Sequence, residues 1–373
     1  MLDGAVTLFL GGDVMLGRGI DQILPHPGDP TLCERSVRDA RTYVELAEAV
    51  NGPIPRPVGY SWPWGDALVI LDRLRPDIRL VNLETSVTRS EHFATGKGVH
   101  YRMSPDNLPA LSAARPDVCS LANNHVLDFG ISGLEETLDV LSRARISVAG
   151  AGRDAKEAAQ PVIVPGDGGR VVVFSFGTTS SGVPRSWAAT ANRPGISLLP
   201  DLSDDTAAAI TAQVSRVKRR GDVVIASVHW GPNWTYAVAP RQVRFAHRLV
   251  DGGVDLVHGH SAHHPQSIEI YRDRLVLYGC GDLIDDYEGI AGYEQYRDDL
   301  RLLYFATVER STGRLTALRM ALMQTHQLRL RTAAPKDCLW MCQTLNRLGR
   351  GTWIALDAIG LLELTDRSPS SLG

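Results

Sequence analysis

The sequence predicts an α/β protein in which two β-sheets pack together with helices outside. Strands alternate with helices from the amino terminus to about residue 257, and short polar turns then join further strands into hairpins. The chain has 373 residues, of which 44% are hydrophobic and 22% charged. This length and composition allow one large hydrophobic core with, at most, a small appendage.

Apolar and β-branched runs predict the strands of the alternating part, at residues 6–10, 78–83, 118–121, 146–149, 171–176, 223–228 and 254–257. Apolar residues at helical spacing predict the helices, at residues 37–50, 67–74, 105–114, 133–144, 206–218 and 242–250. Residues 21–62 are rich in proline and glycine, and we expect a long, functional loop there around the first helix.

The later part of the chain changes character. Residues 267–271 and 275–278 are predicted to form one hairpin, and residues 302–308 and 314–323 a second. After residue 335 we expect a helical tail to the end of the chain. The predicted organisation is therefore a main domain at 1–333 and a C-terminal helical tail at 334–373.

Charge and hydropathy exclude several classes of protein. The net charge is −3 and the sequence pI is about 6.4, with no basic stripe of the kind that binds nucleic acid or anionic membranes. No run approaches the roughly 18 apolar residues of a membrane span, and the amino terminus lacks the pattern of a signal peptide. We expect a cytoplasmic protein without a membrane segment. The phosphate-binding and dinucleotide-binding glycine motifs are also absent from the sequence.

Polar residues of metal-binding type follow five of the predicted strands. They are Asp13, then Asn82 and Glu84, then Asn123, Asn124 and His125, then His229, and finally His258, His260, His263 and His264. Each alone has an ordinary explanation as a turn, cap or structural residue. Ligands of α/β sheets bind beyond the carboxyl ends of strands, and here every instance falls at that end. Oxygen and imidazole ligands together indicate Mn, Fe, Zn or Co rather than calcium.

Five motifs, in order, carry a family resemblance: GGDVMLGR, VNLETSVT, LANNHVLDFG, SVHWG and GHSAHHPQ. Together they resemble the poly-gamma-glutamate capsule-synthesis (CapA) family of the calcineurin-like metallophosphatase superfamily, over about residues 6–310. The resemblance implies a four-layer α/β/β/α sandwich of two mixed sheets. It also implies a metal site, commonly dinuclear, at the strand ends.

The resemblance assigns metal-ligand roles to six residues, Asp13, Glu84, Asn124, His229, His260 and His263. Glu84 falls where the superfamily has an acid that bridges two metals, and His125 where it has a catalytic acid. The expected cofactor is one or two divalent ions, with Mn, Fe or Zn as candidates.

Two departures from the superfamily pattern affect this site. The superfamily begins with Asp-x-His, whereas the third position here is Met15, so one metal loses an imidazole ligand. The final motif also has one residue more than the usual GHxH, which leaves His263 and His264 as alternatives. The family spacing favours His263.

Six further residues are candidate substrate contacts: Arg18, Lys97, Arg102, Trp230, Trp234 and Asp282. Arg18 is also a candidate catalytic residue, because a guanidinium pairs well with phosphate or carboxylate. Each has a structural alternative, as a surface charge, a packing aromatic or a turn residue. Cys33, Cys119, Cys280, Cys338 and Cys342 are too scattered to suggest a disulfide framework.

The sequence leaves two functions open. The first is a metal-dependent hydrolase that attacks a phosphoester, or an amide of a small anionic, glutamyl-type substrate, since both reactions pass through an anionic centre that metals stabilise. An enzyme that forms or breaks an amide in a small metabolite also fits. The alternative is an accessory or binding protein in the biosynthesis of poly-gamma-glutamate or a related amide metabolite.

Overall fold

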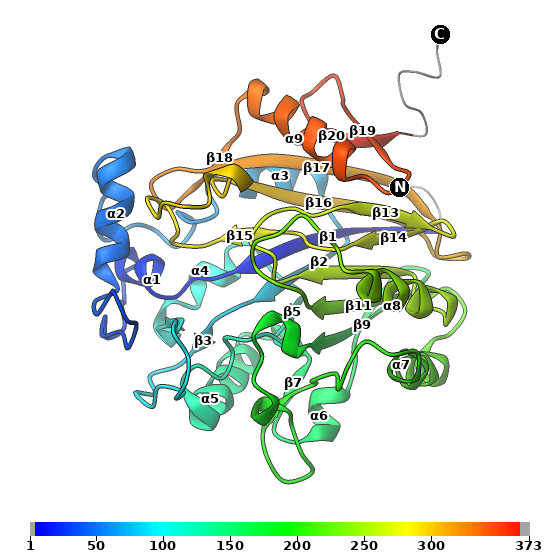
Figure 1. Ribbon diagram of the computed structural model, residues 1–373, viewed down its shortest axis with the longest axis horizontal. Coiled ribbons are helices and arrows are strands. Elements are labelled where there is room, and N and C mark those ends of the chain that lie inside the picture. Colours follow the sequence, from blue (N-terminus) through cyan, green and yellow to red (C-terminus); the bar gives the residue numbers. More distant parts are fainter. Residues whose placement is uncertain (1–3, 366–373) are drawn as a thin grey trace.

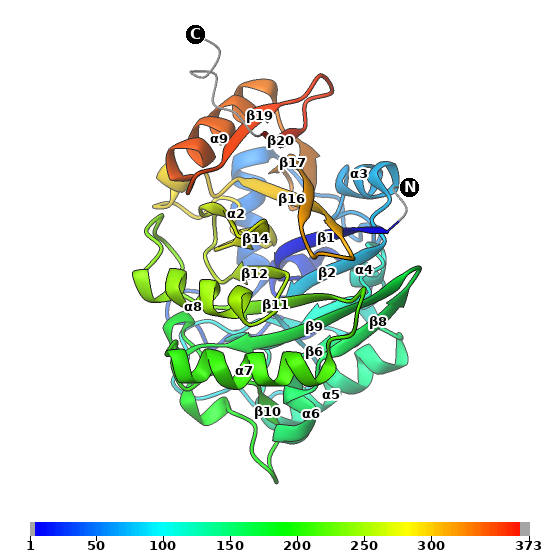
Figure 2. The ribbon, with the colours of Figure 1, turned by 90° about the vertical axis from the view of Figure 1, so that its right-hand side faces the viewer.

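The computed structural model describes residues 4–365 and consists of two packed β-sheets with helices on their outer faces (Figures 1 and 2). In sheet order, the first sheet contains β19 (Trp353–Leu356), β20 (Leu362–Thr365), β17 (Leu315–Thr325), β16 (Leu300–Glu309), β1 (Ala5–Val14), β2 (Ile78–Leu83), β5 (Val118–Ser120) and β6 (Ser147–Ala149). Two short strands extend it, because β15 (Asp282–Ile284) pairs with β1 and β18 (Leu330–Thr332) with β17.

The second sheet contains, in order, β13 (Ile268–Tyr271), β14 (Arg274–Leu277), β12 (Leu256–His260), β11 (Val223–His229), β9 (Gly169–Gly177) and β8 (Val162–Gly166). Both sheets are mixed: β1, β2, β5 and β6 run parallel, as do β9, β11, β12 and β14, and the hairpin strands run antiparallel. Two small sheets pair β3 (Ser86–Val87) with β4 (Arg102–Met103), and β7 (Ala151–Gly152) with β10 (Gly195–Ile196).

Helices cover the outer face of each sheet. The first sheet is covered by α3 (Ala67–Leu74), α4 (Pro109–Ser112) and α5 (Gly130–Arg143), whereas α1 (Gly19–Ile23) and α2 (Arg41–Asn51) pack together beyond the carboxyl end of β1 (Figure 1). The second is covered by α7 (Asp204–Val217) and α8 (Pro240–Asp251), which cross the foreground of Figure 2, and α6 (Ala155–Ala159) lies beside β7. The four-layer α/β/β/α sandwich of two mixed sheets is therefore confirmed.

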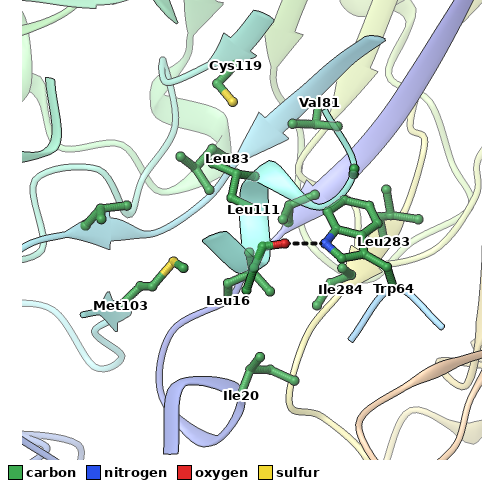
Figure 3. Packing of buried hydrophobic residues seen from close by; sticks show 14 of the residues in the cluster. Leu16, Ile20, Trp64, Val81, Leu83, Met103, Leu111, Cys119, Leu283 and Ile284 are labelled. Carbon is green, nitrogen blue, oxygen red and sulfur yellow. Dashed lines mark hydrogen bonds between the residues drawn. The ribbon is translucent and has the colours of Figure 1, made fainter. Parts of the chain in front are cut away.

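Alternating side chains divide the hydrophobic residues between an inner and two outer layers. Along β1, Val6, Leu8 and Leu10 face the second sheet, whereas Phe9 faces the helices. Trp64 is fully buried in the outer layer and its Nε1 donates to the Ala110 carbonyl at 2.7 Å (Figure 3). The period of two along a strand is what allows one strand to support both layers.

The C-terminal segment differs from its prediction. Helix α9 spans Pro335–Leu348, but β19 and β20 follow it, so the expectation of a helix to the end of the chain is wrong beyond Leu348. Strand β20 pairs with β17, and α9 buries Met341 and Leu345 in the layer between the sheets. Residues 366–373 lie outside the described residues, and the domain division after residue 333 stays a prediction. No helix within residues 4–365 has the length and apolarity needed to cross a membrane.

Candidate metal centre

The carboxyl end of β1 reaches further than the sequence predicted. The predicted strand stopped at residue 10, but β1 continues to Val14 after a register shift against β2 between Leu10 and Asp13. Beside it, β15 runs parallel to β1 and pairs Asp13 with Asp282. Gly12 permits this approach, because a Cβ there would lie 1.7 Å from the Gly281 carbonyl oxygen. The result is two buried carboxylates side by side.

A first group of potential ligands contains Asp13, His229 and His260, whose donor atoms lie within 4.8 Å of one another. His229 ends β11, and His260 ends the neighbouring strand β12, with which it is in register. The Nδ1 atoms of the two rings are 2.9 Å apart, and His260 Nδ1 is 3.9 Å from Asp13 Oδ1. All three side chains are buried.

A second group contains Asp13, His263 and Asp282, again within 4.8 Å. His263 Nδ1 lies 2.8 Å from Asp282 Oδ1, while Asp282 Oδ2 is buried without a hydrogen-bond partner in the described part of the chain. The sequence predicts Asp282 as a substrate contact. The structure instead places it among the potential ligands, because β15 returns beside β1.

Glu84 and Asn124 lie against the first group. Glu84 Oε1 is 3.8 Å from His229 Nε2, and Asn124 Oδ1 is 3.0 Å from the same nitrogen. The Asn82 amide nitrogen donates to both Asp13 Oδ1 (2.7 Å) and Glu84 Oε2 (3.1 Å). Asn82 thus holds the two carboxylates close together. The six predicted metal-ligand residues all meet in this cluster.

The side chains of His263 and His264 point to different surroundings. His263 faces Asp282, whereas His264 turns away from the cluster. The Thr235 backbone N–H donates to His264 Nε2 at 3.2 Å, and the His264 ring stacks on Tyr296 with centroids 4.5 Å apart. The structure therefore places His263 at the cluster and gives His264 a packing role in the loop.

Electrostatics of the cluster favour a bound cation. Burial raises the pKa of Asp13 to about 6 and that of Asp282 to about 7, and it raises the pKa of Glu84 well above its usual range. Burial lowers the pKa of His229 and His260 well below the ordinary value, so these rings are neutral. Within residues 4–365 no lysine or arginine forms an ion pair with the three acids. Burial lowers the pKa of His263, but the neighbouring Asp282 carboxylate raises it above its ordinary value, so this ring pairs with an acid of the cluster. Two neutral imidazoles, crowded carboxylates and an unpartnered carboxylate oxygen fit a divalent transition metal.

His125 stands beside the cluster with one ring nitrogen already engaged. Its Nδ1 is 2.6 Å from Asp128 Oδ2, and Lys97 Nζ lies 2.5 Å from Asp128 Oδ1. Although burial raises it, the pKa of Asp128 lies below its usual range because of His125 and Lys97. Burial lowers the pKa of His125 to about 4, so the ring donates Nδ1–H to Asp128. Its free Nε2 faces Glu84, whose Oε1 is 3.8 Å away.

The predicted substrate contacts divide into two sets. Lys97 and Trp234 border the cluster: the Lys97 ammonium also donates to the Asn124 carbonyl, and the Trp234 ring centroid is 5.1 Å from that of His263. Arg18, Arg102 and Trp230 are engaged in structural contacts. The charge of Arg18 is taken by Glu34 and Asp286, Arg102 donates to the Ser90 and Asp29 carbonyls, and Trp230 Nε1 donates to the Tyr278 carbonyl.

The fold and the cluster define the class first. The protein is an α/β/β/α sandwich with acids and imidazoles gathered at the carboxyl ends of strands from both sheets. The chain belongs to the family described as bacterial capsule synthesis protein PGA_cap, whose family profile matches residues 7–287. This confirms the family resemblance that the sequence motifs carried.

Curated relatives carry names from polymer synthesis. The chain is 53% identical over 347 residues to a "Probable polyglutamine synthesis accessory protein" of Mycobacterium tuberculosis, covering 92% of this chain and 91% of that one. It is 24% identical over 313 residues to the "PGA biosynthesis protein CapA" of Bacillus subtilis, covering 84% and 70%. A solved structure described as a novel phosphatase of Mycoplasma pneumoniae aligns with a TM-score of 0.47 at 12% identity, over 86% of this chain and 94% of that one.

Proposed function

We propose that the protein is a metal-dependent hydrolase acting on a phosphoester, or on an amide bond of a small acidic, glutamyl-type substrate. The observation that carries this proposal is the buried cluster of Asp13, Glu84 and Asp282, which within residues 4–365 forms ion-pair contacts with histidine rings and with no lysine or arginine. Such an excess of buried acid is costly in a protein unless a cation balances it.

The arrangement supports two ions despite Met15. Asp13, His263 and Asp282 would hold one, and His229 and His260 would hold the other together with Asp13. Glu84 and Asn124 flank His229 and would complete the second set. Asp282 adds the carboxylate that compensates for the methionine, which is itself buried. Bound divalent ions supply Lewis-acid activation of water and stabilise the anionic centre of the reaction.

His125 would move the proton. Asp128 fixes the ring with Nδ1–H outward from the cluster, so Nε2 is the atom that takes or returns a proton at the reacting centre. The Lys97 ammonium pairs with Asp128 and favours its ionised form. The same ammonium donates to the Asn124 carbonyl. Lys97, beside His125, and Trp234, beside His263, remain the proposed substrate-facing residues.

The test combines metal content with turnover. Protein reconstituted with Mn²⁺, Fe²⁺ or Zn²⁺ should hydrolyse members of a panel of phosphoesters and γ-glutamyl amides, and chelator should abolish the reaction. His125→Gln should retain the metal and lose turnover. Metal-loaded protein that hydrolyses neither class, in a panel where a known phosphodiesterase and a known γ-glutamyl hydrolase serve as positive controls, would contradict the proposal.

A second candidate is an accessory role in the synthesis of a glutamate polymer, in which the cluster binds the acidic chain without cleaving it. The observation that favours it is the word "accessory" in the name of the 53% identical relative. One variant distinguishes the two candidates, because a binding protein should retain its affinity for the acidic ligand in His125→Gln.

A further inference from the structure

Two buried polar residues lie next to the metal cluster but are not among its potential ligands. Ser227 on β11 and His258 on β12 are in register with each other, two residues before His229 and His260. Both are completely buried. A buried hydroxyl and a buried imidazole are costly unless every polar atom is satisfied, so their contacts explain why they are tolerated.

The contacts form an unbroken chain from the first sheet to the cluster. His258 Nε2 lies 2.9 Å from the Gly11 carbonyl oxygen on β1. On the other side of the ring, His258 Nδ1 lies 3.0 Å from Ser227 Oγ, and Ser227 Oγ lies 2.9 Å from His260 Nε2. The chain therefore runs from Gly11 through His258 and Ser227 to His260, the last of which faces Asp13.

The Gly11 carbonyl, at one end of this series of hydrogen bonds, determines the position of every proton in the series. A backbone carbonyl only accepts, so His258 must carry its proton on Nε2. No carboxylate in residues 4–365 forms an ion pair with His258, and the buried ring therefore holds a single proton. Its Nδ1 is then an acceptor, and the single Ser227 proton must be donated to it. Ser227 Oγ is left to accept, so His260 must carry its proton on Nε2.

We propose that Ser227 and His258 are positioning residues that fix His260 as the Nε2–H tautomer and leave its Nδ1 lone pair directed at the metal cluster. The expected consequence of this tautomer is tighter metal binding, and that consequence rests on the metal centre of the proposed function. The tautomer itself is a property of the protein alone. A metal-binding histidine is held in this way when its second nitrogen donates to a fixed acceptor.

His263 provides an internal contrast. Its Nε2 lies 2.8 Å from the Asn233 side-chain amide, which can present either its oxygen or its nitrogen after a flip. Asn233 is also exposed, whereas Ser227 is buried. The Asn233 contact thus selects no tautomer of His263, which is oriented instead by the Asp282 carboxylate at its Nδ1, whereas the series of contacts from the Gly11 carbonyl permits only one tautomer of His260. His260 and His263 are therefore oriented by different kinds of partner, a hydroxyl and a carboxylate.

The first arm of the experiment uses the wild-type protein without metal. Long-range ¹H–¹⁵N correlation spectra, assigned through His260→Gln and His258→Gln, should show both rings as Nε2–H tautomers between pH 6 and 8. An Nδ1–H tautomer or a doubly protonated ring at His260 would overturn the proposal. This arm needs no metal and no substrate, so its result is independent of the proposed function.

The second arm measures Zn²⁺ and Mn²⁺ affinity by competition with a chromophoric chelator. Ser227→Ala should weaken binding by about 10- to 100-fold, the usual cost of losing such a partner. Ser227→Thr keeps the hydroxyl on a strand and should restore most of the affinity. Ser175→Ala is the matched control, because Ser175 is the register neighbour of Ser227 on β9, is buried, and has Ser120 as its hydroxyl partner at 2.6 Å.

The outcomes separate the two proposals. Equal loss of affinity in Ser227→Ala and Ser175→Ala, or affinity unchanged in Ser227→Ala, would overturn the positioning role. A wild-type protein that binds no metal would overturn the proposed function and the affinity consequence together, while the spectra would still decide the tautomer. Metal binding with the predicted tautomer, but without hydrolysis, would contradict the hydrolase alone.

Discussion

Among residues 4–365, two buried charge clusters differ in whether an arginine closes them. In the first, the Arg18 guanidinium is paired with Glu34 (2.9 Å) and Asp286, and it stacks on the Tyr43 ring 3.8 Å away. In the second, Asp13, Glu84 and Asp282 form no ion pair with a lysine or arginine among the described residues, and the His263 ring lies 2.8 Å from Asp282. Buried acids that an arginine balances hold loops together, whereas buried acids without a lysine or arginine partner are suited to bind a metal ion. We call the first cluster closed and the second open.

The largest expected effect comes from opening the closed cluster. Arg18→Met leaves Glu34 and Asp286 buried without their cation, and we expect the free energy of unfolding to fall by about 3–5 kcal/mol. Urea unfolding followed by circular dichroism measures this. Metal bound per folded molecule should stay the same, because Arg18 contacts none of the potential ligands. A variant as stable as the wild type would show that the closed cluster is not structural.

Removing the proton-carrying residue should separate chemistry from metal binding. In His125→Gln we expect kcat to fall by about 10²- to 10⁴-fold with the metal content unchanged. Steady-state kinetics and elemental analysis on the same preparation measure both quantities. A loss of metal in this variant would instead make His125 a ligand and would merge its role with that of the acid cluster.

The open cluster should also make stability depend on pH and metal together. The folded pKa values of Asp13 (about 6) and Asp282 (about 7) lie above the ordinary aspartate value near 3.9, so protonation favours the folded metal-free protein. That contribution is complete below about pH 4 and is lost as the pH rises through 6 to 7. Metal binding needs the ionised acids, so its stabilisation grows over the same range.

We therefore expect the rise in melting temperature on adding metal to be larger at pH 8 than at pH 5. At a free metal concentration 100 times Kd, the stabilisation is about 2.7 kcal/mol. Differential scanning calorimetry at the two pH values, with and without chelator, gives the comparison. An equal rise at both pH values would mean that the acids are already ionised without metal.

The sequence predicted local elements well and distant pairings poorly. Helix α3 and strand β2 have the predicted bounds, because each is specified by its own hydrophobic period. The position of Asp282 beside Asp13 was not predicted, since it depends on β15 returning beside β1 from about 270 residues away. The only local signal was the Gly281-Asp282 step after a hairpin strand.

The same limit applies to the partners of Arg18 and to the C-terminal hairpin. Arg18 was expected at the substrate because an arginine after a strand end suggests an anion site, and its partner Asp286 is separated from it by 268 residues. The hairpin after α9 was missed because its register is set by pairing with β17, as in Met320 with Leu362. That the proposed ligand residues lie together could be predicted because parallel strands place their carboxyl ends together.

The most direct measurement of the central claim is the metal content of four proteins after reconstitution and removal of free metal. The account predicts two equivalents in the wild type, one in Asp282→Asn, and none retained tightly in Asp13→Asn, which belongs to both ligand groups. Asp255→Asn is the control, because Asp255 is equally buried but lies before β12 and is paired with Lys218 at 2.7 Å, so it should keep two. Metal content that is the same in all four proteins, or absent from the wild type, would contradict the assignment of this cluster as a metal centre.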